Sequence, residues 1–259
     1  LTTWIAGYAS DVIIRNKFGS TKELRDLFIK PTVIKGIDFS WSDIKRNIRI
    51  PKEMNESLAK ETGIHIGDGN LYITNPQGDS HSYQYCISGD LTDEFLFHTE
   101  FISRLMKKIY NLDGAFIKRF DKNNIDSKYR SKAIVQFKNK TLKLPIGSKK
   151  NIKIPPEILK DNSFMKKCVS GIIDTDFSIT SSLAISGKIN NLFVAKEMHK
   201  NFDKNNIKHV YVLYNTYARF YIPKKYALVI VNEWRLDNPK HLSKYQVFDE
   251  FKKFIPFTT

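Results

Sequence analysis

The sequence has very few of the residues that build disulfide-rich domains and cysteine-based metal sites. Its 259 residues include only two cysteines, Cys86 and Cys168. These two cannot form a disulfide framework or a CxxC metal site. Both lie in apolar sequence contexts, so we expect buried free thiols, which are typical of proteins in a reducing compartment.

Long apolar segments and an excess of acidic residues are also missing. No apolar run approaches the length of a membrane-spanning helix, and no signal peptide is visible, so we expect no membrane association. There are 27 Asp and Glu against 42 Lys and Arg, which gives a net charge of +15. Such a basic balance suggests a polyanionic partner; the alternative is a solvated, lysine-rich surface. The 41% of hydrophobic residues, including 18 Phe and 12 Tyr, indicates a well-packed globular protein.

Two similar stretches, residues 61–69 and 169–177, stand out in the sequence. Each is a short, apolar, helix-like run with two small residues four positions apart on one side. Positions i and i+4 lie on the same helix face, and a face without large side chains lets another helix approach closely. We therefore predict that the stretches form two helices packed against each other. The small residues are Gly63 and Gly67 in the first stretch and Gly171 and Thr175 in the second.

Each stretch carries an aspartate near its C-terminal end, Asp68 in the first and Asp176 in the second. If the two helices pair, these carboxylates arrive side by side. Two close carboxylates with no basic group beside them repel each other, and the usual remedy is a hard divalent cation bound through oxygen. The pattern thus predicts a divalent metal site between Asp68 and Asp176.

The segments around the two stretches repeat as well. An Ile-Xaa-Ile-Pro sequence precedes each of them, at residues 48–51 and 152–155. Hydrophobic periodicity predicts the element order α-β-β-α-β-β-α in both copies. We therefore predict an α+β fold of two pseudo-symmetric repeats, residues 49–150 and 151–259, after an N-terminal helical extension over residues 1–48. Their antiparallel sheets would form a saddle, with the motif helices at the pseudo-two-fold axis.

The periodicity also gives approximate element bounds. Gly67-Asp68-Gly69 is expected to end the first motif helix with a C-terminal glycine. Short helical patterns at residues 19–28 and 39–45 of the extension fit either a helix-turn-helix or a packing extension. After residue 238 we expect a closing segment of no assigned structure. The expected helices are 53–67, 91–111, 164–175, 189–202 and 226–234, and the expected strands are 71–74, 83–88, 115–120, 129–137, 178–180, 182–186, 209–214 and 218–223.

Polar side chains alternate with apolar ones along the first hairpin of each repeat. The apolar members can face the helices, which leaves the polar members on the outer face of the sheet. Hydroxyls and amides on such a ribbon can read base edges in a DNA major groove; the alternative is an ordinary solvent-exposed sheet face. The outward residues are Tyr72, Thr74, Ser82, Gln84 and Ser88 in the first repeat and Ser178, Thr180, Ser182 and Ser186 in the second.

With these motifs and their duplication, the chain resembles the LAGLIDADG homing endonucleases in their single-chain form with two repeats. The resemblance covers about residues 48–245. The specific pieces that carry it are residues 62–69 and 170–176 with the Ile-Xaa-Ile-Pro sequence before each. Residues 144–150 and 238–242 also resemble segments of archaeal-type members. The resemblance implies a monomeric, intron-encoded or intein-encoded enzyme that cuts both strands of a long double-stranded DNA target at a specific site.

In that family the last acid of each motif binds a divalent metal at the scissile phosphates. The resemblance therefore implies that Asp68 and Asp176 are catalytic metal ligands, with Mg²⁺ or Mn²⁺ as the cofactor. The backbone carbonyls of Gly67 and Thr175 are expected to contribute. Asp174 holds a motif position that is usually structural.

The resemblance also implies a peripheral basic residue that steadies the attacking water or the phosphate. Our first candidate is Lys188, which follows the matched strand end in the second copy. Phe177 departs from the family pattern, because the last motif position is usually glycine. Lys132 and Arg219 are further candidates for this peripheral role, and Arg130, Lys132 and Arg219 are also candidates for DNA contacts. Each basic residue could instead be a plain phosphate contact or a solvated surface charge.

Two alternatives use the same scaffold. One is a maturase that binds intron RNA, and the other is a DNA-binding regulator that has lost cleavage. A protein that does not cleave would be free to lose either acid, so the presence of both aspartates favours the endonuclease. We expect a prokaryotic, archaeal-type cytoplasmic location, with an organelle as the alternative.

Overall fold

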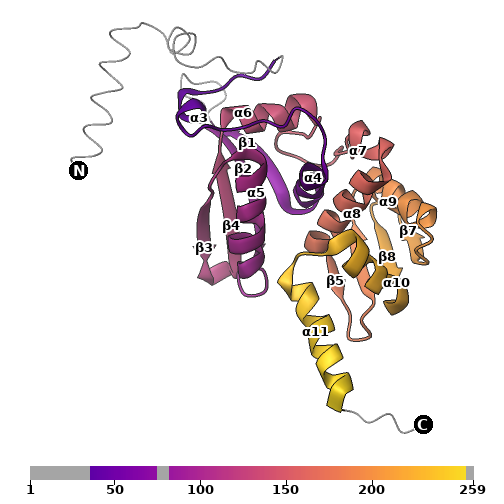
Figure 1. The fold of residues 1–259 in the computed structure, drawn as a ribbon. Coiled ribbons are helices and arrows are strands. Elements are labelled where there is room, and N and C mark those ends of the chain that lie inside the picture. Colours follow the sequence, from indigo (N-terminus) through magenta and orange to yellow (C-terminus); the bar gives the residue numbers. More distant parts are fainter. Residues whose placement is uncertain (1–35, 75–81, 255–259) are drawn as a thin grey trace, which may run out of the picture.

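The computed structural model of the protein describes residues 36–74 and 82–254. Figure 1 shows two units on either side of a central pair of helices, α4 (Glu56–Asp68) and α8 (Asn162–Asp176). The pattern at residues 39–45 forms the short helix α3 (Trp41–Lys45), whereas the helix expected at 19–28 lies outside the described residues. Nowhere in the described ranges is a helix both long and apolar enough to cross a membrane.

Each unit contains the expected succession of strands and helices. In the first unit α4 is followed by β1 (Gly69–Thr74), β2 (Ser82–Asp90), η1 (Phe97–Ile102), α5 (Ser103–Tyr110), β3 (Ala115–Arg119), η2 (Phe120–Lys122), β4 (Asn124–Arg130), α6 (Lys132–Gln136) and η3 (Phe137–Thr141). In the second unit α7 (Pro156–Lys160) precedes α8, which is followed by β5 (Phe177–Ile179), β6 (Ile185–Ile189), α9 (Leu192–Lys204), β7 (Val210–Leu213), β8 (Ala218–Ile222), α10 (Lys224–Val229), η4 (Ile230–Arg235) and α11 (Pro239–Phe254).

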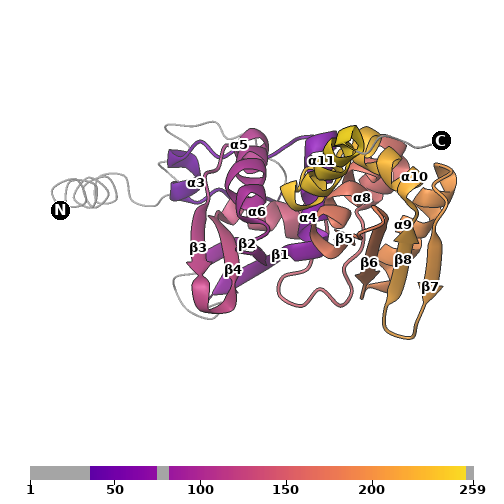
Figure 2. The ribbon, with the colours of Figure 1, turned by 90° about the horizontal axis from the view of Figure 1, so that it is seen from below.

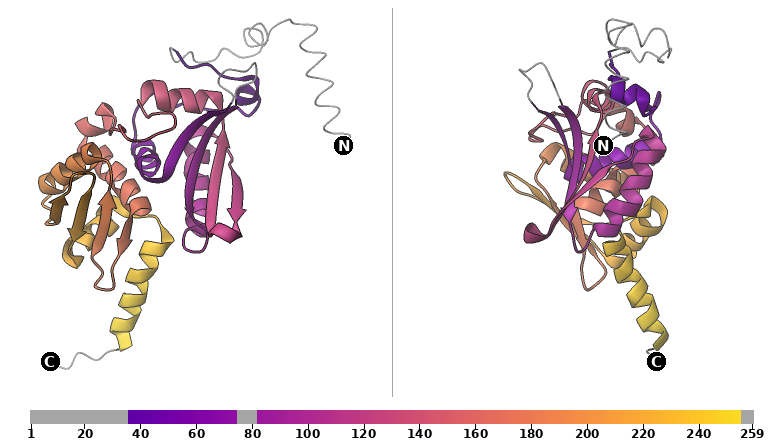
Figure 3. Two further views of the ribbon diagram at one scale, coloured as in Figure 1. Left: turned by 180° about the vertical axis from the view of Figure 1, so that it is seen from behind. Right: turned by 90° about the vertical axis from the view of Figure 1, so that its left-hand side faces the viewer.

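The two sheets have the same topology, which confirms the α+β fold with an internal duplication. Their strand orders are β1-β2-β4-β3 and β5-β6-β8-β7, and neighbouring strands in both sheets pair antiparallel. In both units the strand that follows the motif helix, β1 or β5, therefore lies at one edge of the sheet. Figure 2 shows the strands of both units along one side of the molecule, with α5 and α11 on the other, and Figure 3 gives the arrangement from behind and from the side.

The motif helices begin at capping residues. The side chain of Asn55 accepts a hydrogen bond from the backbone N–H of Leu58, and the side chain of Asp161 accepts from Ser163 and Phe164. These contacts satisfy N–H groups that have no partner inside the helix. The two helices therefore start at defined positions, which fixes where their last residues lie.

Each motif helix continues directly into the first strand of its sheet. At the boundary Gly69 has φ −79° and Phe177 has φ −113°, both extended backbone. The first motif helix thus ends at Asp68 with Gly69 as its C-cap, as predicted, although the backbone of Gly69 is extended and not left-handed. Gly69 is needed because a β-carbon there would lie 2.8 Å from Nδ1 of His65. Phe177 fits its position because extended backbone accepts any residue.

The small residues of α4 and α8 allow the two backbones to touch. A β-carbon on Gly63 would overlap the carbonyl oxygen of Cys168, and one on Gly171 would overlap that of Lys60. The buried apolar residues of both units form one continuous cluster across this contact. The predicted tight helix pair at the pseudo-two-fold axis is thus confirmed.

One predicted strand is wrong over most of its length. Instead of a strand over residues 129–137, β4 ends at Arg130 and helix α6 follows. The reason is an N-cap, because the hydroxyl of Ser131 accepts a hydrogen bond from the N–H of Ile134 at 3.2 Å. The apolar residues that suggested a strand are buried in this helix.

Other elements also differ from the expectations. The helix expected over residues 91–111 contains a π-helical turn, η1, before α5. The strand expected over residues 182–186 begins only at Ile185, because residues 180–184 form the turn between β5 and β6. The closing segment contains the long helix α11, for which the sequence analysis made no prediction.

Candidate metal centre between the motif helices

Asp68 and Asp176 are the last residues of α4 and α8, so the helix pair brings both carboxylates to the same end of the contact. A β-carbon on Gly67 would lie 3.4 Å from Oδ2 of Asp176 and would overlap the hydroxyl of Thr175. Asp68 is half-buried, and Asp176 reaches solvent. The structure therefore brings together the two acids that the sequence pattern placed side by side.

The surroundings of the two carboxylates oppose their ionisation. Burial, followed by the negative charges of Asp176 and Glu94, raises the pKa of Asp68 to about 7. Burial also raises the pKa of Asp176 to about 6, although the cations of Lys149 and Lys240 act against it. In the part of the chain that the structure describes, no group donates a hydrogen bond to either carboxylate. A bound cation would relieve this repulsion, which is the behaviour expected of a metal site.

The raised pKa of Asp68 has a consequence for stability. Because the ordinary value is 3.8, the folded protein binds this proton more tightly than the unfolded chain does. Without divalent ions, the contribution of this group to the free energy of unfolding therefore falls as the pH rises from about 4 to about 7. We expect Asp68→Asn to be more stable than wild type at pH 8 by on the order of 2 kcal/mol, after a discount for partial exposure. Urea unfolding at pH 4.5 and pH 8 measures this difference, and an equal gain at both pH values would contradict it.

A lysine from the connection between the repeats lies beside the acids. Leu71 of β1 forms a parallel bridge with Ile146, which fixes the course of the connection. Further along, Nζ of Lys149 donates to the carbonyl oxygens of Gly67 and, at 3.2 Å, of Ile66. Burial lowers the pKa of Lys149, while the two motif acids raise it. The ammonium group of Lys149 thus occupies a position at the Gly67 carbonyl, one of the two carbonyls expected to bind a metal ion.

The donor set matches a hard divalent ion. The carboxylates of Asp68 and Asp176 and the backbone carbonyls of Gly67 and Thr175 are all oxygen donors, which Mg²⁺ and Mn²⁺ prefer. The hydroxyl of Thr175 lies 3.0 Å from the carbonyl oxygen of Ile172 and hydrogen-bonds back into its own helix. We therefore regard the two carboxylates as the main candidate ligands.

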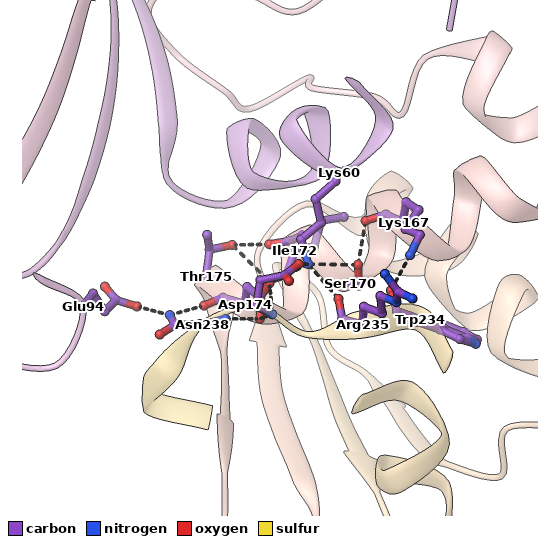
Figure 4. Close-up of polar contacts among 12 residues, drawn as sticks. Lys60, Glu94, Lys167, Ser170, Ile172, Asp174, Thr175, Trp234, Arg235 and Asn238 are labelled. Carbon is purple, nitrogen blue, oxygen red and sulfur yellow. Dashed lines mark hydrogen bonds and ion pairs between the residues drawn. The ribbon is translucent and has the colours of Figure 1, made fainter. Parts of the chain in front are cut away.

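Asp174 is fully buried and bonded within the protein. Its carboxylate accepts from Nζ of Lys60 at 2.6 Å and from the backbone N–H groups of Asp237 and Asn238 at 3.1 to 3.2 Å. The Asn238 side chain donates to the Asp174 carbonyl at 2.8 Å and to Glu94 at 3.0 Å (Figure 4). These contacts fit the structural role expected for Asp174, because they tie the segment before α11 to the end of the helix pair.

In the first sheet, the register places the predicted polar residues on one face. Tyr72 lies opposite Gln84, Gln84 lies opposite Arg130, and Thr74 lies opposite Ser82. Tyr72, Thr74, Ser82 and Arg130 are exposed, and Gln84 is half-buried. This face is therefore available to a partner.

Ser88 lies on the same face, but its hydroxyl is already used. It donates to Asp126 at 2.7 Å, and Arg119 pairs with the same carboxylate at 2.9 Å. The neighbouring Lys128, opposite Cys86, was not among the predicted contact residues although its position in the register puts it on this face. Alternation along β4 is the signal that could have found it.

The second sheet also presents polar and basic residues on one face. Ser178 lies opposite Ser186, and Lys188 lies opposite Arg219. Nζ of Lys188 is 4.3 Å from the centre of the Tyr217 ring, and the guanidinium of Arg219 is 5.8 Å from it. These two cations therefore form a basic, aromatic patch at the end of the sheet.

A pocket of about 450 Å³ lies between Asp176 and Lys188, the first residue from the metal centre and the second from this patch. Its walls include Gly67, Asp176, Lys149 and Lys188. Lys188, predicted as the peripheral basic residue, thus shares a pocket with one motif acid. Lys149, which the sequence analysis did not single out, shares the same pocket.

Three predicted contact residues do not lie on strands. Lys132 is on helix α6, where it pairs with Asp38 at 3.1 Å, because Ser131 caps a helix there. Thr180 and Ser182 lie in the β5–β6 turn, and their hydroxyls are 2.9 Å apart. The prediction that Thr180 and Ser182 are strand residues is therefore wrong, as is that for Lys132.

Solved structures with this arrangement exist. The structure of I-DmoI in complex with DNA and Ca matches 74% of this chain and 97% of its own, with a TM-score of 0.57 and 13% identity. The match to the complex of I-DmoI with DNA and Mn covers 71% of this chain and 99% of the I-DmoI chain, with a TM-score of 0.55 and 15% identity. The match to a mesophilic variant of the homing endonuclease I-DmoI covers 70% of this chain and 96% of the variant, with a TM-score of 0.54 and 14% identity. The chain has the LAGLIDADG homing endonuclease fold.

The LAGLIDADG fold was recognisable in the sequence only through its motifs. No protein-family profile and no curated protein matches the sequence. At 13 to 15% identity the structural likeness establishes the fold, and the site has to be argued from this chain's own residues.

Glu94, Lys149 and Lys240 are the residues near the acids that the sequence analysis did not assign to the site. Nζ of Lys240 lies 2.6 Å from Glu94, and both change the pKa of the motif acids. Lys149 and Lys240 belong to the archaeal-like segments 144–150 and 238–242. The resemblance of those segments to the family could have drawn attention to both lysines, but the sequence of the segments does not show which side chain faces the acids.

Proposed function

We propose that this protein is a site-specific homing endonuclease that hydrolyses both strands of a long double-stranded DNA target. The observation that carries the proposal is the pair of aspartates with raised pKa values, Asp68 and Asp176, at the end of two touching helices in the LAGLIDADG fold. The I-DmoI structures with DNA and Mn or Ca support DNA as the substrate and a divalent ion as the cofactor. Both motif acids come from a single chain, which is consistent with a monomer, and the buried free thiols of Cys86 and Cys168 are consistent with a reducing cytoplasm.

The residues of the site suggest how cleavage proceeds. Divalent ions held by Asp68 and Asp176 would neutralise the phosphates and activate water for phosphodiester hydrolysis. The polar faces of the two sheets bind the duplex and set its register on the protein. Lys188, in the pocket beside Asp176, is placed to hold a phosphate or the attacking water. The ammonium group of Lys149 would offset part of the negative charge of the two acids when no ion is bound, and would pair with a DNA phosphate when one is.

Incubation of the protein with a library of duplexes and Mg²⁺, followed by sequencing of the cut ends, tests the proposal. We expect double-strand ends that share one long sequence and that disappear with EDTA. Specific binding without cut ends would favour a DNA-binding regulator. Binding of structured RNA in preference to every duplex would favour an intron RNA maturase.

Lys149→Met should lower the Mg²⁺ concentration needed for half-maximal cleavage. At pH 8.5 both acids are ionised, and the ammonium group then repels the incoming ion. Removing about 1 kcal/mol of repulsion corresponds to roughly a fivefold shift. Cleavage rates measured across a Mg²⁺ titration give this value. Lys150→Met, which removes the exposed neighbouring charge in the same pocket, is the matched control. An equal shift in both variants would contradict a specific role for Lys149.

A further inference from the structure

A second cluster of potential ligands lies far along the second sheet from the motif acids. It is found where α9 meets the start of β7, which is the last strand in the order β5-β6-β8-β7. His199 and Asp203 are one turn apart on α9, and His209 directly precedes β7. One ligand atom from each of the three side chains lies within 4.8 Å of the others. Figure 1 shows α9 and β7 in the outer part of the second unit.

The hydrogen bonds of His209 determine which of its nitrogens is free. Nδ1 lies 2.7 Å from the carbonyl oxygen of Ile207, and a carbonyl only accepts, so Nδ1 carries the proton. In the neutral ring, Nε2 therefore presents a lone pair. This atom lies 2.8 Å from Nδ1 of His199.

His199 stands between this lone pair and a carboxylate. If its Nδ1 donates to His209, the Nε2 of a neutral ring presents its own lone pair toward Asp203, 3.6 Å away. Facing a carboxylate with a lone pair is unfavourable. A positive charge among the three side chains, such as a bound metal ion, would relieve this contact.

We propose that His199, Asp203 and His209 form a binding site for a late first-row divalent ion, with Zn²⁺ as the best match. A site with two imidazoles and one carboxylate binds Zn²⁺ in preference to Mg²⁺. One ligand atom from each of the three side chains lies within 4.8 Å of the other two, so a small adjustment of the side chains brings them to the ~3.4 Å expected between two ligands of a tetrahedral Zn²⁺. The bond from Nδ1 of His209 to a backbone carbonyl is of the kind that orients metal-binding histidines.

Aromatic neighbours hold the two imidazoles in place. The His199 ring stacks on Tyr211 with centroids 4.4 Å apart, and the His209 ring packs against Phe202 at 5.0 Å. Ordered rings reduce the entropy lost when an ion binds. An ion here would tie α9 to the edge strand β7 and stabilise the second unit, separately from the ions proposed for cleavage.

Zn²⁺ binding by the full-length, untagged protein tests this site. The protein is treated with EDTA, desalted, and titrated with ZnCl₂ alone against a chromophoric chelator, while thermal unfolding is followed in parallel. We expect one equivalent to bind and to raise the melting temperature. Co²⁺ should give visible absorption bands of a four-coordinate site.

Asp203→Asn and His209→Ala should weaken Zn²⁺ binding by about 100-fold or more, since even residues that only support ligands contribute 10- to 100-fold. Asp203 is exposed, so its isosteric variant is expected to fold. Glu197→Gln, which removes an acid elsewhere on α9, and Asp68→Asn are controls that should bind Zn²⁺ as wild type does. The proposal is overturned if wild type shows no Zn²⁺ binding, if Asp203→Asn binds as tightly as wild type, or if only Asp68→Asn loses the ion.

Discussion

Asp68→Asn should abolish Mg²⁺-dependent cleavage while leaving binding of the target duplex within a few-fold of wild type. The amide keeps the shape of the side chain but loses the charge that holds the ion. A loss of at least about 1,000-fold in the single-turnover rate is expected, because several kcal/mol of transition-state stabilisation disappear with the ion. Duplex binding depends mainly on the sheet faces, which this substitution does not touch. Rates on a target duplex and binding in Ca²⁺ measure the two effects separately.

The controls for this prediction separate a chemical loss from a structural one. Asp176→Asn should behave in the same way, since both acids lie at the end of the helix pair. Asp93→Asn, an exposed acid of the first unit, should cut at the wild-type rate. Asp68→Asn is expected to be more stable than wild type at pH 8, so unfolding cannot account for its inactivity. Cleavage by Asp68→Asn at a rate near that of wild type would rule out the metal assignment.

Gly63→Ala should destabilise the protein by about 3 kcal/mol or more. The new β-carbon would overlap the carbonyl oxygen of Cys168, a backbone atom that cannot move without separating α4 from α8. Overpacking of a rigid contact typically costs ~1–3 kcal/mol, and backbone overlap lies at the upper end. A loss of stability would be informative, because alanine in the interior of a helix is otherwise more stable than glycine by about 1 kcal/mol.

Urea unfolding of Gly63→Ala at pH 8 measures this effect. Ser57→Ala, in the first turn of the same helix, serves as the control and should change the free energy of unfolding by less than about 1 kcal/mol. If Gly63→Ala is as stable as wild type, the two helices do not touch in the way described here.

The features that could be predicted from the sequence are those set by local patterns. Small residues at helical spacing identified the contact between α4 and α8, and the position of each aspartate within its motif placed it at the end of a helix. The repeat of the Ile-Xaa-Ile-Pro lead-in then gave the duplication. Alternation along the first hairpin was enough to put Tyr72 and Gln84 on one face.

The features that were missed depend on capping or on contacts distant in sequence. The residues after Arg130 alternate like a strand, but Ser131 caps a helix there. Asn238 before Pro239 is a helix-start signal for α11, with Oδ1 of Asn238 accepting from the N–H of Lys240 at 3.1 Å. Lys149 reaches the acids only because the connection pairs with β1, and no local pattern encodes such a contact.

A crystal structure of the protein with its target duplex and Mn²⁺ tests the central claim most directly, because the anomalous signal locates each ion. We predict Mn²⁺ within about 2.2 Å of carboxylate oxygens of both Asp68 and Asp176, against the DNA backbone. Mn²⁺ found only at His199, Asp203 and His209, or motif carboxylates that face neither an ion nor the DNA, would contradict the account.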